Sequence, residues 1–452
     1  MTPLAHGLGG VRDLPVPTWL FFWGAGVVLA VSFVALAVLW RRPLLEAKAA
    51  GRPLPQGLQR VLLSPALRVA LQAVAFVLLV VVWAAAAFGK DTAALNLAPT
   101  FVYANFWVGM VPLVVLFGNV WAVLNPWRAA ADGAAALARA LGARYEPPLR
   151  YPDRLGRWPA AVGLLAFVAL ELAYVESSRP RALAIAIGVY SFATWLGMAA
   201  FGRRDWLENG EAFTVYFGLL ARISPFARRD GEIVVRTPAS GLAEGMPRPG
   251  TQAFIAVMLG SVAFDGFSRT TLWQDRYYSV QVDLLDSPGL ADVVGTLMNL
   301  GGLLGAILVV ALAFRLAVAA AAWVVDEPAR LGQAFALTLV PIALVYAIAH
   351  YFSLLVYQGQ YSIKLASDPF GWGWDLFGTS DFAPNLGLLT PNAIWYVQVV
   401  ALVLGHVLGL VLAHDRALGL FRSGGSAVWS QYPMLVLMVG YTVTGLWLLS
   451  QG

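Results

Sequence analysis

Ten long apolar runs divide this chain of 452 residues. A bilayer core is about 30 Å thick, so a helix that crosses it needs about 20 consecutive apolar residues. The composition agrees, since 59% of the residues are apolar, 12% are charged and the mean hydropathy is +0.71. A soluble domain of this length carries far more charge. The sequence therefore predicts an all-α, polytopic integral membrane protein with about ten transmembrane helices. The runs lie near Trp19–Trp40, Val69–Phe88, Phe101–Leu124, Ala160–Val175, Arg181–Phe201, Thr251–Phe267, Val293–Phe314, Leu331–Tyr357, Asn392–Ala413 and Gln431–Leu449.

The Lys and Arg residues alternate with these runs. Of the 30 cations, 23 fall in every second gap, beginning with the gap after the first run. Because cytoplasmic loops keep an excess of Lys and Arg, we expect these gaps on the cytoplasmic side and both termini on the outer side. The net charge of +5 then reflects orientation, and no nucleic-acid partner is predicted. The other seven cations are Arg12, Lys90, Arg179, Arg181, Arg269, Arg276 and Lys364.

The first residues, the composition and the absence of Cys indicate how the chain is inserted, which membrane it belongs to and which chemical groups it lacks. Met1–Pro17 contains no apolar stretch long enough for a signal peptide, so the first run is expected to act as its own insertion signal. Frequent Ala, Arg, Gly, Leu and Val residues are typical of a GC-rich bacterial genome, which favours a bacterial inner membrane. The chain has no Cys, so disulfides, thiolate metal sites and Cys nucleophiles are excluded.

The gaps between the runs define the expected organisation. Residues 1–18 form an outward segment, and residues 19–201 hold spans one to five with a cytoplasmic interfacial helix at 126–144. Residues 202–250 form a cytoplasmic loop with a second interfacial helix and a short strand at Glu232–Arg236. Residues 251–449 hold spans six to ten and two aromatic outward loops, 268–291 and 358–391. These loops serve as interfacial anchors or as a lid over an outward cavity, and the basic cytoplasmic loops can dock a protein partner.

Polar residues inside the spans are the candidate functional residues. An ionisable side chain that faces lipid costs about 2.5–3.5 kcal/mol, so each one needs a partner or a cavity. The fourth run carries Glu171, Tyr174 and Glu176 in its outer turns, and Asp265 and Arg269 in the sixth are four residues apart, a spacing that predicts an ion pair.

The eighth run has a polar stripe, Tyr346, His350, Ser353 and Tyr357, at spacings of four, three and four residues. Asn105 and Asn299 in the third and seventh runs lie at a similar depth. We therefore predict that Glu171, Asp265 and His350 are catalytic and that the other polar residues line the same outward cavity. Structural hydrogen bonds between helices are the alternative.

Two further His residues, His406 and His414, lie on the ninth run. On one helix they are about 12 Å apart and about 80° from each other around the axis, so they cannot share a metal ion. A haem between His350 and His406 is not favoured, because the two depths, about 10 Å and about 20 Å, differ.

Three stretches resemble a family of bacterial membrane proteins that carries the name fenitrothion hydrolase. They are AHGLGGVRDLPVPTWLF at Ala5–Phe21, VPLVVLFGNVWAVLNPWR at Val111–Arg128, and the segment from GHV to AHDRAL at Gly405–Leu418. The resemblance extends over most of the layout of the chain. It implies hydrolysis of an organophosphorus triester at the membrane.

A metal would suit that reaction, because metal ions activate water and polarise the phosphoryl oxygen. On the outer side only His6 and His350 are available, with Glu171, Glu176, Asp265 and Asp13 as carboxylates. This set is compatible with a single divalent metal ion but not with a His-rich metal pair. In the family the residue matching His6 often lies close to a mature N-terminus, where it could hold copper.

Three functions therefore remain open from the sequence. The first is a membrane hydrolase or metal-dependent enzyme that uses Glu171, Asp265 and His350. The second is a transporter or permease for a small solute, a metal or protons. The third is a membrane subunit without catalytic activity, whose partner binds the basic cytoplasmic loops.

Overall fold

The computed structural model describes residues 18–143, 145–323, 331–421 and 424–451, and 73% of the structure is helical. Helices occupy all ten apolar runs. The long ones are α1 (Thr18–Leu39), α4 (Pro65–Phe88), α9 (Trp158–Leu172), α10 (Pro180–Phe201), α13 (Thr251–Phe267), α15 (Pro288–Ala322), α17 (Val340–Ser367), α18 (Pro391–Leu420) and α20 (Tyr432–Gln451). The third run follows α5 (Leu97–Thr100) and is divided among the π-helix η2 (Phe101–Val108), α6 (Met110–Phe117) and the short α7 (Trp121–Leu124).

Six continuous helical segments among the described residues are long and apolar enough to cross a membrane. They are Gln56–Phe88, Leu97–Phe117, Pro180–Phe201, Pro288–Ala322, Leu331–Ser367 and Pro391–Leu420. A seventh results if α13 and the following α14 (Thr271–Asp283), which meet at 73°, are counted as one bent span. The chain is thus a polytopic, nearly all-α protein suited to a lipid environment. The number ten stays a prediction.

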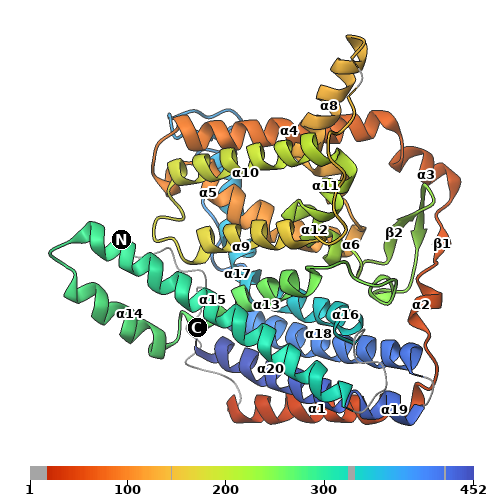
Figure 1. Cartoon of the computed structure of the whole chain (residues 1–452). Coiled ribbons are helices and arrows are strands. Elements are labelled where there is room, and N and C mark those ends of the chain that lie inside the picture. Colours follow the sequence, from red (N-terminus) through yellow and green to blue (C-terminus); the bar gives the residue numbers. More distant parts are fainter. Residues whose placement is uncertain (1–17, 144, 324–330, 422–423, 452) are drawn as a thin grey trace.

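The long helices run alongside one another, and the two ends of the bundle differ (Figure 1). One end, the sheet end, carries a small β-sheet and most short helices, whereas the opposite end, the α14 end, carries α14 and the segment after α17. In Figure 1, α1 begins and α20 ends at the α14 end. The shorter elements are α2 (Leu45–Lys48), α3 (Gln56–Leu62), η1 (Ala93–Leu95), α7 (Trp121–Leu124), α8 (Pro126–Ala140), α11 (Arg203–Asn209), α12 (Ala212–Leu220), η3 (Ser240–Leu242), α16 (Leu331–Ala336), η5 (Leu337–Leu339) and α19 (Gly424–Trp429).

The centre of the bundle is formed by α13 and α17. Of the 17 residues of α13, 13 are buried, and α17 packs against α13, α18 and η2. By contrast, α1, α4 and α15 expose many large apolar side chains, including Val31, Val77 and Val309. Such side chains are expected where a helix faces lipid. Polar groups on α13 and α17 are therefore enclosed by protein.

The β-sheet confirms the strand that the sequence predicted within Glu232–Arg236. Its order is β1 (Arg52–Pro53), β3 (Glu232–Val235) and β2 (Phe226–Arg229), with both pairs antiparallel. The β2–β3 turn consists of Asp230 and Gly231, whose φ angles of 51° and 87° are both positive. An Asp-Gly pair adopts this turn readily, because its twist matches that of the strands.

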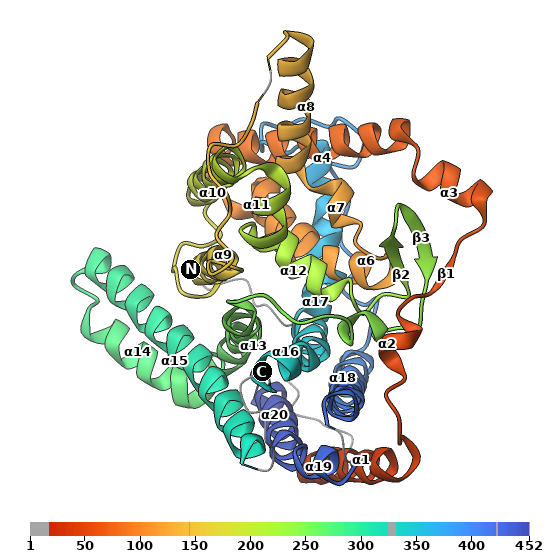
Figure 2. The same cartoon turned by 45° about the vertical axis from the view of Figure 1, so that its right-hand side comes forward.

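The segment 202–250 differs from the predicted surface loop with an interfacial helix. α12 lies inside the bundle, where Phe213, Phe217 and Leu220 are buried and Phe217 packs against Phe106 and Trp121. The acids that suggested a surface helix belong to α11 and to its junction with α12, whereas α12 itself is almost wholly apolar. α8, expected at 126–144, ends at Ala140 and projects from the bundle across the direction of α4 and α10 (Figure 2).

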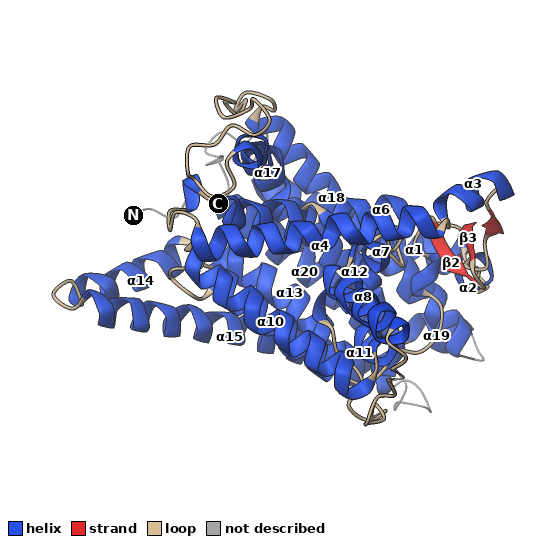
Figure 3. Cartoon of the chain, turned by 90° about the horizontal axis from the view of Figure 1, so that it is seen from above, coloured by secondary structure: helices blue, strands red, loops and turns tan. Residues whose placement is uncertain are grey.

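The two aromatic loops expected at 268–291 and 358–391 contain more helix than predicted. α14 fills most of the first, and with the start of α15 it forms a hairpin that projects from the bundle (Figure 3). α17 continues to Ser367, so the irregular part of the second loop is limited to residues 368–390. That part is fixed to the chain between α4 and α5, since the carbonyl groups of Pro369 and Phe370 accept hydrogen bonds from Leu97 and Lys90.

Candidate functional site

The central contact of the candidate site joins α13 to α17. His350 Nε2 lies 2.6 Å from Asp265 Oδ2, a hydrogen bond that carries one proton between an imidazole and a carboxyl group. The side chains of Asp265 and His350 are only 8% and 11% exposed. Two titratable groups therefore share a proton between the two central helices of the bundle.

Arg269 holds the other oxygen of the same carboxylate. Its Nη2 donates to Asp265 Oδ1 at 3.1 Å, which confirms the ion pair that the four-residue spacing predicted. Arg269 lies in the break between α13 and α14, where the chain bends by 73°. The site therefore lies next to the break between α13 and α14.

Glu171 on α9 approaches this pair from a third helix. Its carboxyl group lies close enough to Asp265 for the two charges to interact. Glu171 Oε2 is buried, and no residue in the described part of the chain forms a hydrogen bond with it. Three phenol groups, those of Tyr103, Tyr216 and Tyr351, lie near enough to Glu171 to interact with its charge. The three predicted catalytic residues are thus neighbours in the structure.

Tyr351 and Tyr216 were not among the residues that the sequence predicted for the site. Tyr351 follows His350 directly and so falls outside the polar stripe of α17, although its hydroxyl interacts with Asp265. Tyr216 belongs to α12, which was interpreted as a surface helix. The available signal was the apolar composition of α12, AFTVYFGLL, because an interfacial helix carries polar residues along one face.

A small cavity adjoins the His–Asp pair. Its volume is about 20 Å³, and its wall is formed by residues of α13, α17, α18 and α20. The lining residues are Val262, Gly266, Tyr346, Ala349, His350, Leu402, Gly445 and Leu448. This volume suits one water molecule, and His350 and Tyr346 are the polar side chains on the wall.

The residues of the polar stripe of α17 contact different parts of the molecule. The Tyr346 hydroxyl donates to the carbonyl oxygen of Tyr441, and the Tyr357 hydroxyl donates to that of Leu389 at 2.9 Å. Ser353 is buried one turn from His350. Thus Tyr346 and His350 share the cavity, whereas Tyr357 fixes the loop that precedes α18.

The remaining predicted binding residues lie outside the cavity wall. Asn105 Oδ1 accepts a hydrogen bond from Ser362 at 2.5 Å and ties η2 to α17. Tyr174 donates to Glu176 at 3.2 Å at the exposed end of α9. Asn299 is half-buried on α15. The structure therefore brings together only some of the residues predicted to line one cavity, namely those around Asp265 and His350.

Metal ligation finds little support in the described part of the chain. There, no three His, Asp or Glu side chains gather closely enough to hold a metal ion. His350 Nε2 is engaged by Asp265, and His6 lies outside the described residues. The single divalent metal ion and the copper ion stay predictions from the sequence.

The two His residues of α18 are separate from the cluster and from each other. His406 is fully buried, its Nδ1 lies 2.8 Å from the carbonyl oxygen of Leu402, and its ring contacts that of Tyr346 at 5.9 Å between centroids. His414 connects α18 to the end of α1 through the carbonyl group of Trp40, and to Gln431. His414 thus joins helices near the sheet end.

Comparison of the chain with protein-family models, with curated proteins and with solved structures found no match in any of the three. The resemblance to the fenitrothion hydrolase family therefore stays a prediction from the sequence.

Proposed function

We propose that this chain transports protons across a bacterial inner membrane, and that Asp265 and His350 are its protonation site. It has about ten spans, with the sheet end in the cytoplasm. The observation that carries the proposal is the 2.6 Å contact between Asp265 and His350 on two central helices.

The chemistry of this pair favours proton transfer. Imidazole is the side chain whose ordinary protonation change falls between pH 5 and pH 8, and ionisable groups within membrane spans commonly form proton relays. The negative charge of Asp265 and the positive charge of Arg269 cancel, so the three side chains Asp265, Arg269 and His350 carry no net charge while His350 is neutral. Uptake of one proton gives them a net charge of +1. Glu171 stands close enough to respond to that charge.

The broken helix supports transport rather than a fixed scaffold. Transporters often place their sites where a membrane helix is interrupted, because the ends of the two pieces can move and supply polar groups. Here Arg269 lies at the break between α13 and α14, four residues from Asp265. A change of charge at Asp265 would act directly on the ion pair beside this break.

The cavity volume argues against a hydrolase at this position. A pocket for a small organic molecule usually measures roughly 300–1,000 Å³, whereas the cavity beside His350 measures about 20 Å³. A water molecule fits it, and an organophosphorus triester does not. Water beside an imidazole is what a proton path requires.

Proton entry into proteoliposomes tests the proposal. With an inward proton gradient and a pH-sensitive dye inside, the wild type should acidify the lumen faster than protein-free liposomes do. Asp265→Asn and His350→Gln should each reduce the excess rate at least about tenfold, since either change removes one member of the pair. Asp286→Asn, a carboxyl change at an exposed position between α14 and α15, is the matched control and should retain the wild-type rate.

Gel filtration and the melting temperature of each variant report whether it is folded. Two results would contradict the proposal. In one, the wild type acidifies the lumen no faster than empty liposomes do. In the other, the folded variants Asp265→Asn and His350→Gln acidify it as fast as the wild type does.

A further inference from the structure

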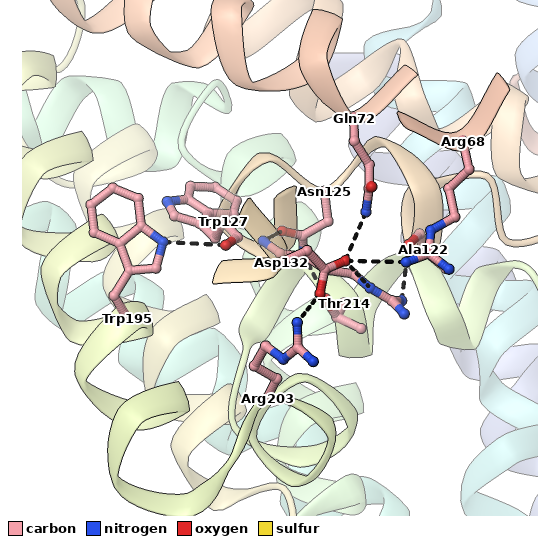
Figure 4. Close-up of polar contacts among 10 residues, drawn as sticks. Arg68, Gln72, Ala122, Asn125, Trp127, Asp132, Trp195, Arg203 and Thr214 are labelled. Atoms are coloured by element: carbon pink, nitrogen blue, oxygen red, sulfur yellow. Dashed lines mark hydrogen bonds and ion pairs between the residues drawn. The ribbon is translucent and has the colours of Figure 1, made fainter. Parts of the chain in front are cut away.

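A separate cluster at the sheet end gathers three guanidinium groups around one carboxylate (Figure 4). Asp132 on α8 contacts Arg203 at the start of α11, and its Oδ2 lies 3.5 Å from Arg68 Nη2 and 3.8 Å from Arg128 Nε. The amide of Gln72 donates to the same oxygen at 3.0 Å. Three helices, α4, α8 and α11, therefore converge on one carboxylate.

The positive charge of this cluster exceeds its negative charge. Burial lowers the pKa of Arg128, and the charges of Arg68, Arg203 and Arg228 lower it further, whereas Asp132 acts in the opposite direction. One carboxylate thus opposes at least three cations. The guanidinium groups remain reachable, since the side chains of Arg68, Arg128 and Arg203 are 52%, 38% and 41% exposed.

The cluster borders an apolar surface suited to lipid. Val69 follows Arg68 on α4, and Phe192 and Leu196 belong to α10, the helix before Arg203. The side chains of Val69, Phe192 and Leu196 are largely exposed. Trp195 lies between Phe192 and Leu196 in the sequence and is 38% exposed, and its indole N–H donates to the carbonyl oxygen of Trp127 at 3.2 Å. Trp is typical of the boundary between hydrocarbon and headgroups. The cations therefore lie where apolar helix surface gives way to polar surface.

We propose that Arg68, Arg128 and Arg203 bind the phosphate of an anionic phospholipid whose acyl chains lie along α4 and α10. Guanidinium groups match phosphate because they offer several parallel N–H donors with a permanent charge. The excess of cations selects an anionic headgroup over a zwitterionic one. The adjoining apolar side chains favour a lipid over free phosphate, because free phosphate gains nothing from them.

Asp132 has a definite role in this proposal. It brings the three Arg side chains together and also weakens the field that an incoming phosphate experiences. Loss of its charge should therefore strengthen lipid binding, whereas loss of Arg charges should weaken it. A purely structural ion-pair network predicts no such opposite response.

The test measures binding of phosphatidylglycerol and phosphatidylcholine to the purified full-length protein in detergent, by native mass spectrometry. The wild type should prefer phosphatidylglycerol. In the double variant R68Q/R203Q this preference should fall roughly 25-fold, since each of the two lost cations contributes about a fivefold factor near a membrane surface. R60Q/R139Q removes the same charge from exposed positions at the same end and should keep the preference.

Two further measurements separate the alternatives. D132N should raise the preference for phosphatidylglycerol, and inorganic phosphate at matched concentration should neither stabilise the wild type against heat nor displace the lipid. The proposal is overturned if the wild type binds both lipids equally, if R68Q/R203Q keeps the preference, or if D132N lowers it in a folded protein. Displacement of the lipid by inorganic phosphate would make the site a phosphate site instead.

Discussion

Glu211 and Glu171 occupy contrasting surroundings in the same bundle. Glu211 precedes α12, and its carboxylate accepts hydrogen bonds from the N–H groups of Phe213 and Thr214, both at 2.8 Å, and from the amide of Asn125 at 3.0 Å. The Tyr190 hydroxyl donates to it as well. These donors cap the start of α12 and satisfy the charge. One oxygen of Glu171 has no hydrogen-bond partner among the described residues, so it remains available to interact with a proton.

Asp91 gives a prediction on pH at the α14 end. Arg179 Nε donates to it at 2.8 Å, and the backbone N–H of Arg181 donates at 3.1 Å. Burial alone would raise the pKa of Asp91, but these hydrogen bonds and the two Arg charges outweigh it and hold the pKa below the ordinary value of 3.8. The folded state therefore favours the ionised form, and the resulting stability is present above pH 3.8 and lost as the pH falls through the folded pKa.

Asp91→Asn should lower the melting temperature in detergent at pH 7, and the difference from the wild type should shrink as the pH falls below about 4. Asp283→Asn, on an exposed part of α14, is the control and should leave the melting temperature almost unchanged. A difference between the wild type and Asp91→Asn that is equal at pH 3 and pH 7 would contradict this assignment.

Among the helices, α13 and α15 make an unusually close contact. A Cβ atom at Gly260 would lie 2.5 Å from the Cα atom of Ile307, so only a residue without a side chain fits there. Small residues of this kind let two membrane helices approach closely. Gly260→Ala should force the two helices apart, destabilise the protein by about 1–3 kcal/mol, and displace Asp265, five residues further along α13.

The melting temperature and the proton entry rate should both fall in Gly260→Ala. Gly305→Ala on α15 is the matched control, because nothing lies within 4 Å of its added Cβ, and Ala favours a helix over Gly. Equal melting temperatures for the two variants would show that α13 and α15 can separate without penalty.

Features that depend on residues close together in the sequence, such as helices and ion pairs within one helix, could be predicted from the sequence. Hydropathy located the long helices, and the four-residue spacing predicted the pair of Asp265 and Arg269. The contact of Asp265 with His350 spans 85 positions of sequence, and only their similar depth in two spans suggested it. Cavity residues such as Leu402 and Gly445 could not be predicted, because nothing in an apolar helix tells which neighbour it faces.

The whole molecule separates its charges between the two ends of the bundle. The sheet end carries α8, α11 and the β-sheet, to which most of the Arg-rich gaps belong, and α14 lies at the opposite end (Figure 1). α1 begins and α20 ends at the α14 end, an arrangement that needs an even number of crossings between them. Ten crossings meet this requirement.

Single cysteines test the orientation, because the chain has no Cys of its own. Glu232→Cys on β3 and Ser279→Cys on α14 are both exposed positions. A maleimide that cannot cross membranes should label Ser279→Cys in intact bacterial cells, and Glu232→Cys only after the cells are opened. Labelling of Glu232→Cys in intact cells would place the Arg-rich end outside.

The same reagent decides whether α9 is a span. Its 15 residues extend about 22 Å, which is less than a hydrocarbon core of about 30 Å, so α9 crosses only if the bilayer thins or flanking residues complete the span. Asp153→Cys and Ser178→Cys lie before and after α9 in exposed positions. Because Glu171 belongs to α9 and approaches Asp265 from it, we expect a complete crossing, with only Ser178→Cys labelled in intact cells. If both positions were labelled from one side, α9 would be re-entrant, and the number of spans would differ from ten.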